Sequence, residues 1–119
     1  MIQQRWNIVF AQNAEYQETV SVGTWPSTYP ALSTATEWRL TMSKPDAAAF
    51  LTASSIGASP MITLNVGKTV GTIIVPVATT SLLPLGSARY DLDIFFPSSI
   101  TKRLISLGYA QVITHAGAI

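Results

Sequence analysis

The stretch Ala-Arg-Tyr-Asp-Leu-Asp-Ile-Phe-Phe, residues 88–96, alternates apolar and polar side chains for almost its whole length. Alternation at period two is typical of a β-strand with one buried face. Pro97, Ser98 and Ser99 then interrupt the pattern, and a second run rich in Leu, Ile, Tyr and Val occupies residues 102–113. The two runs predict an antiparallel hairpin closed by a loop of roughly four or five residues.

Further strands are predicted upstream of this hairpin. Residues 37–43 place Trp38, Leu40 and Met42 at alternate positions between polar neighbours. Residues 61–66 and 69–75 are β-branched runs on either side of Gly67 and Lys68, which predicts a second hairpin with Gly67 at a positive φ. Residues 5–10 and 16–22 also have the composition of strands.

Helix signals are short. Asp46 follows Pro45 and precedes three alanines, so it is placed to cap a single helical turn over residues 47–51. Residues 79–83 predict one more turn, which Pro84 ends. Residues 23–33, which include Trp25, Pro26, Tyr29 and Pro30, are predicted to form the longest surface loop.

The spacing of these segments indicates the fold class. Short strands separated by turn signals indicate a β-sandwich or a small barrel, and we favour the sandwich. No internal repeat or low-complexity linker divides the chain. We therefore expect an all-β fold in which residues 1–119 form a single antiparallel β-sandwich of about seven strands, with one or two short helical turns.

Composition limits the function. Apolar residues make up 48% of the 119 residues and charged residues only 11%, so Ser and Thr must supply most of the polar surface. Because the net charge is only +1 and the basic residues are scattered, we expect no nucleic-acid partner. There is no cysteine and no apolar run long enough to span a membrane. Residues 1–10 lack the apolar stretch of a signal peptide, which predicts synthesis in the cytosol.

Two groups of side chains are candidates for chemistry. His115 is the sole histidine, without Cys, Asp or Glu nearby in sequence, and it reads as an ordinary terminal side chain. Asp91 and Asp93 share one face of a strand, where they could hold a hard cation or act as paired acids. The alternative is a solvent face in which Lys102 or Arg103 on the next strand pairs with them, and we favour it. We expect no catalytic, metal or cofactor site.

Aromatic residues are the candidates for partner binding. Trp25 and Tyr29 lie in the predicted loop, where they could anchor a partner or fold back over the end of the sandwich. Sequence alone leaves both readings open. Tyr16 and Trp6 are added as partner-binding candidates from the first two strands.

The second half of the chain carries a longer pattern of turns and strands. Its parts are Ile73-Ile74-Val75-Pro76, Leu83-Pro84-Leu85-Gly86, Tyr90-Asp91-Leu92-Asp93 and Lys102-Arg103-Leu104-Ile105-x-x-Gly108. With Trp38-Arg39-Leu40, the pattern resembles the small β-sandwich domains at the N-terminus of bacteriophage baseplate upper proteins and related fibre adaptors. Two features depart from it: Pro97-Ser98-Ser99 stands where these domains usually have Asp-Gly, and the chain ends where a fibre region often begins.

This resemblance implies a non-enzymatic structural protein of a phage tail, baseplate or fibre adaptor, located in the virion after synthesis in the host cytoplasm. The implied partners are other virion proteins and further copies of the chain, in a trimer or hexamer. The alternative is a module that binds carbohydrate or a host receptor through Trp25, Tyr29, Tyr109 or Trp6. A small hydrolase using His115 or the Asp91 and Asp93 pair is the weakest reading, because the remaining catalytic groups are missing.

Overall fold

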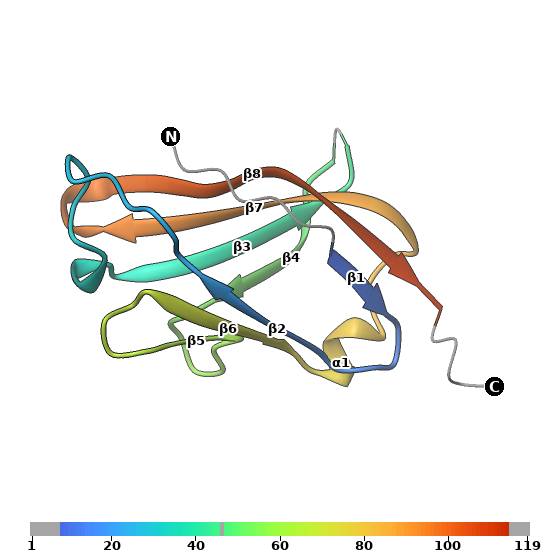
Figure 1. The fold of residues 1–119 in the computed structure, drawn as a ribbon. Helices are drawn as coiled ribbons and strands as arrows, with labels where there is room; N and C mark the ends of the chain where they lie inside the picture. Colours follow the sequence, from blue (N-terminus) through green and yellow to red (C-terminus); the bar gives the residue numbers. More distant parts are fainter. Residues whose placement is uncertain (1–7, 46, 115–119) are drawn as a thin grey trace.

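The computed structural model describes residues 8–45 and 47–114, apart from the side chains of residues 105–107, and over this range the chain is a two-layer β-sandwich. Figure 1 shows the two layers, with the long strands β7 and β8 in one and β2, β5 and β6 in the other. The all-β sandwich expected from the alternation is confirmed.

The larger layer is a five-stranded sheet of order β1-β8-β7-β3-β4. Its centre is the hairpin expected from the sequence, although both strands are longer and the connection is the shorter segment Pro97–Ser99. One pair departs from the antiparallel expectation, since β1 runs parallel to β8 with Ile8 opposite Ala110. The strands are β1 (Ile8–Ala11), β3 (Glu37–Ser43), β4 (Ala49–Ser54), β7 (Gly86–Phe96) and β8 (Ile100–Ile113).

The smaller layer is an antiparallel three-stranded sheet of order β2-β6-β5. The expected hairpin of residues 61–75 forms its β5 and β6 strands, and β2 pairs along the whole of β6. A short helix, α1 (Val77–Thr80), leads from β6 back toward the larger sheet (Figure 1). The strands are β2 (Tyr16–Ser21), β5 (Ile62–Leu64) and β6 (Val70–Val75).

The core lies between the inner faces of the two sheets. Trp38 of β3 is fully buried, and a Cβ added at Gly71 of β6 would come within 2.7 Å of its indole ring. Glycine at this position therefore lets the two sheets approach closely. The largest fully buried side chains are Trp38, Tyr90, Phe10, Ile8, Leu40, Met42, Ile62, Ile73, Leu92, Ile94 and Leu104.

The prediction of a helical turn over residues 47–51 is wrong. Residues from Ala49 onward belong to β4, which pairs with β3, while its proposed cap Asp46 lies outside the described residues. Leu51 and Ala53 alternate as buried residues, so pairing and burial override the helix propensity of the alanines. The other expected turn forms a little earlier than predicted, as α1 after Pro76.

Both hairpin turns use unexpected residues. In the β5–β6 turn the positive φ of 56° falls on Lys68 and not on Gly67. The Asn65 carboxamide closes this turn by accepting bonds from the N–H groups of Thr69 and Val70. In the β7–β8 turn, Ser98 and Ser99 have φ of 67° and 61°. Both serines therefore adopt the left-handed backbone conformation, which is uncommon for residues other than glycine.

Candidate interaction surfaces

The outer face of the five-stranded sheet brings Asp91 and Asp93 together with Arg103. The Nε atom of Arg103 on β8 donates to Asp93 at 2.8 Å, and its Nη1 atom lies 3.8 Å from Asp91. The hydrogen bond to Asp93 is the main reason that the pKa of Arg103 is raised. Cross-strand pairing, the favoured reading of the sequence, is therefore what the structure shows.

No group of three potential metal ligands occurs among the described residues, and the guanidinium of Arg103 already lies between the two aspartates. His115 lies outside the described range, so its proposed role stays untested.

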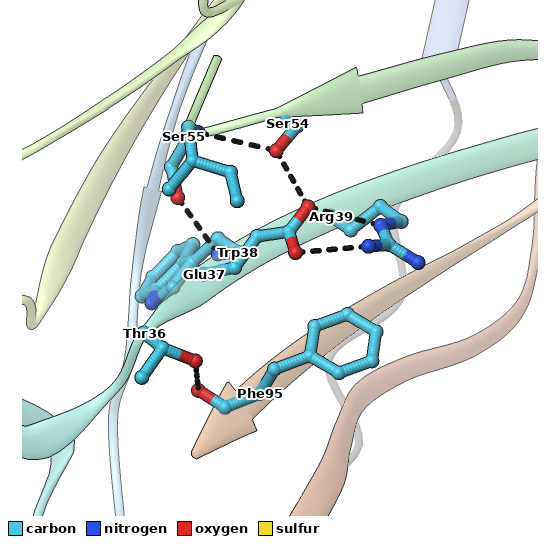
Figure 2. Close-up of polar contacts among 8 residues, drawn as sticks. Thr36, Glu37, Trp38, Arg39, Ser54, Ser55 and Phe95 are labelled. Atoms are coloured by element: carbon cyan, nitrogen blue, oxygen red, sulfur yellow. Dashed lines mark hydrogen bonds and ion pairs between the residues drawn. The ribbon is translucent and has the colours of Figure 1, made fainter. Parts of the chain in front are cut away.

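A second cluster on the same sheet, shown in Figure 2, was missed by the sequence analysis. Glu37 is only 7% exposed, although it occupies an outward-facing position of β3. Its carboxylate accepts two bonds from Arg39, at 2.9 and 3.0 Å, and one from the hydroxyl of Ser54 at 2.5 Å. Glu37 and Arg39, two apart on one strand, could have been recognised as sharing a face.

Burial and hydrogen bonding act in opposite directions on the pKa of Glu37. Burial alone would raise the pKa of its carboxyl, but the hydrogen bonds from Arg39 and Ser54 and the charge of Arg39 together hold the pKa below its usual value. Arg39 also lies over the ring of Phe95, 4.5 Å from the centroid. The cluster therefore ties β4, β3 and β7 together across the sheet (Figure 2).

The loop aromatics fold back over one end of the sandwich. Trp25 is half-buried, with its ring centroid 6.1 Å from that of Phe96 and its indole N–H donating to the carbonyl of Pro30 at 2.8 Å. Tyr29 packs edge-on against Trp25 and carries the ammonium of Lys102 over its ring at 4.3 Å. The sequence left open whether these aromatic residues anchor a partner or fold back over the end of the sandwich. In the structure they fold back, and their packing orders the loop.

The remaining aromatic candidates differ in exposure. Tyr16 is half-buried against Phe10, and burial, followed by the nearby Glu18 and Tyr90, raises the pKa of its hydroxyl. Tyr109 is 64% exposed on β8, where it lines a shallow pocket of about 240 Å³ with Val9, Ser87 and Gln111. Trp6 lies outside the described residues.

The outer face of the three-stranded sheet has a different character. Thr72 on the central strand lies directly opposite Thr19 on one side and Thr63 on the other. The only charged residue of these strands, Glu18, lies on the alternate positions that face inward with Val20. The outward residues are all uncharged: Gln17, Thr19, Ser21, Thr63, Val70, Thr72 and Ile74.

No family model matches the chain, and no curated protein matches its sequence. Among solved structures it is similar to the first immunoglobulin-like domain of human CD48 antigen, with 8% sequence identity over 95% of this chain and 84% of that chain. The TM-score is 0.36, and we draw nothing about function from this likeness. Within the described part of the chain, no helix is both long enough and apolar enough to cross a membrane.

Proposed function

We propose that this chain is a non-enzymatic structural module of a virion, acting in a phage tail, baseplate or fibre adaptor through assembly with other virion proteins and with itself. The observation that carries the proposal is the uncharged outer face of the three-stranded sheet, centred on the row Thr19, Thr72 and Thr63. A surface without charge can be covered by a protein partner without the cost of desolvating ions.

Exposed apolar side chains support the same reading. Val66 at the tip of the β5–β6 hairpin is fully exposed, and Leu82 after α1 is 84% exposed. Both side chains offer apolar area that a neighbouring subunit can cover. We place the proposed assembly in a virion because the sequence pattern of strands and turns resembles that of baseplate and fibre-adaptor domains.

The test is to purify virus particles from a culture that expresses the chain from its own gene, and to quantify its peptides by mass spectrometry across a density gradient. We expect the chain in the particle fraction at a fixed ratio to the other structural proteins. An abundant chain that is absent from the particles overturns the proposal.

A second candidate is a carbohydrate-binding module, which the exposed Tyr109 favours. Its ring could stack on a sugar face, while Ser87 and Gln111 in the same shallow pocket offer hydrogen bonds. In calorimetric titration with host surface polysaccharide, Tyr109→Ala should abolish binding. Trp25→Ala is the comparison variant, because Trp25 is instead packed against Phe96. No heat of binding with any host polysaccharide excludes this reading.

A further inference from the structure

The shallow pocket beside Tyr109 lies on the outer face of the five-stranded sheet, where β1, β8 and β7 run side by side (Figure 1). Gln111 of β8 lies directly opposite Val9 of β1 and Ser87 of β7. Two positions earlier on β8, Tyr109 lies directly opposite Arg89 of β7. Because alternate residues of a strand share a face, Arg89 lies on the same face as Ser87 and borders the pocket.

The ring of Tyr109 is available for stacking. The residue is 64% exposed, and among the described residues no other ring and no cation packs against it. The amide of Gln111 and the hydroxyl of Ser87 line the same pocket, and each can both donate and accept hydrogen bonds. Sugar hydroxyls also donate and accept, so an apolar ring face beside such groups fits a sugar.

Arg89 adds a positive charge that this face does not neutralise. The other charged residues of the face, within the described strands, form ion pairs: Glu37 with Arg39, and Asp91 and Asp93 with Arg103. The side chain of Arg89 is exposed and forms no ion pair, hydrogen bond or cation–π contact within the part of the chain that the structure describes. A guanidinium in this state can bind a carboxylate through two parallel hydrogen bonds.

The neighbouring charges favour a carboxylate over a phosphate. A sugar carboxylate carries one negative charge, which a single guanidinium matches. A phosphate group carries up to two. Asp91, two positions from Arg89 on β7, shares Arg103 with Asp93, so this group of three keeps a net negative charge and repels the more highly charged anion.

We propose that the Tyr109 pocket binds an acidic sugar, a hexuronic acid unit of a polysaccharide. Tyr109 stacks on the sugar face, while Gln111 and Ser87 bond to its hydroxyls. Arg89 binds the carboxylate and so selects the acidic sugar over a neutral one. This inference rests on the second candidate function, carbohydrate binding, and names the class of sugar that the site takes.

Calorimetric titration with short oligomers of galacturonate, glucuronate and mannuronate tests the proposal. Each acid is compared with its methyl ester, which keeps the sugar ring and removes the charge. The chain should bind at least one of the acids about tenfold or more tightly than its ester, because a hydrogen bond to a charged group is the stronger kind. Added salt should weaken binding of the acid and leave binding of the ester nearly unchanged.

Variants of Arg89 separate its charge from its shape. Arg89→Gln should lower the affinity for the acid to that for the ester, and Arg89→Lys should retain part of the preference because it keeps the charge. Lys102→Gln is the matched control, since it removes the same charge toward the other end of β8, where Lys102 lies over Tyr29. It should bind both oligomers as the native chain does. Circular dichroism verifies that all three variants are folded.

Equal affinity for acid and ester overturns the selection of an acidic sugar, and so do equal effects of Arg89→Gln and Lys102→Gln. Displacement of the acid by an equal concentration of inorganic phosphate overturns it too. Absence of binding to all of these oligomers also overturns it. Carbohydrate binding itself fails separately, when no host polysaccharide gives a heat of binding or when Tyr109→Ala leaves that heat unchanged.

Discussion

The outer faces of the two sheets differ in how they are kept polar. The five-stranded sheet carries ions that pair across strands, as Arg103 does with Asp91 and Asp93. The outer face of the three-stranded sheet carries none, and its residues are threonines, a serine, a glutamine, a valine and an isoleucine. One face is thus satisfied by its own charges, whereas the other is left neutral.

The difference also concerns how register is fixed. β7 and β8 are long, and their pairing shifts twice between Tyr90 and Asp93. Beyond the second shift, Arg103 lies directly opposite Asp93, and a slip of β8 by one residue would turn Arg103 toward the core. In the three-stranded sheet, the β5–β6 register depends instead on the turn that Asn65 closes with Thr69 and Val70. Charge thus helps to specify the pairing of β7 with β8 in the five-stranded sheet. Turn geometry helps to specify the pairing of β5 with β6 in the three-stranded sheet.

The first prediction concerns the inner faces, where the sheets should not differ. Leu92 of β7 and Ile73 of β6 are both at most 1% exposed. Leu92→Ala and Ile73→Ala should each lower the free energy of unfolding by about 2 to 5 kcal/mol, because both leave a cavity in one shared core. Urea denaturation measures both. A severe loss for one variant with almost none for the other would contradict the shared core.

The second prediction concerns the contact between the sheets. Gly71→Ala places a methyl group within 2.7 Å of the Trp38 indole, which is fully buried and cannot move aside freely. The variant should be destabilised by about 1 to 3 kcal/mol through overpacking. Gly67→Ala is the matched control, since a Cβ there has no neighbour closer than 3.9 Å. Equal thermal unfolding of the two variants would mean that the sheets can separate at little cost.

The strands predicted best from the sequence are those in which one face is buried, because burial makes apolar and polar residues alternate. Tyr90, Leu92 and Ile94 alternate without interruption, and β3 was found with its observed bounds, because one face of each strand lies in the core. The strand at β4 was missed because its alanines resemble a helix, and only the pairing with β3 makes it a strand.

The candidate site was predictable in part. The pairing of Asp91 and Asp93 with a basic residue of the next strand followed from the hairpin alone, since cross-strand neighbours on one face are set by register. The burial of Glu37 could not be predicted, because it depends on Ser54 from β4, a strand that was not predicted and whose first residues were expected to form a helical turn. The packing of Trp25 on Phe96 joins residues far apart in sequence, and local pattern holds no information about it.

The third prediction tests the buried carboxylate of the five-stranded sheet. Glu37→Gln keeps the shape of the side chain but weakens its bonds to Arg39 and Ser54, which should cost roughly 1 to 2 kcal/mol at neutral pH because Arg39 is partly exposed. The folded-state pKa of Glu37 is lowered, so its stabilisation is complete above its ordinary value of 4.5 and is lost as pH falls through the folded value.

Denaturation of both proteins between neutral pH and about pH 3 measures this dependence. The difference in stability between the native chain and Glu37→Gln should be largest near neutral pH and should shrink below pH 4.5. A difference that is constant with pH would mean that the charge of Glu37 is not what holds β3 to β4.

The smallest effect should come from the ion pairs that distinguish the two outer faces. Asp93→Ala should cost at most about 1 kcal/mol, because the side chain of Arg103 is 48% exposed and water screens the pair. High salt should reduce this cost further. Thr72→Ala, at the centre of the uncharged face, should change stability by no more than about 0.5 kcal/mol and should not respond to salt. If Asp93→Ala proved as costly as Leu92→Ala, the charges would stabilise the larger sheet as well as specify its pairing, and the contrast between the two faces would extend to stability.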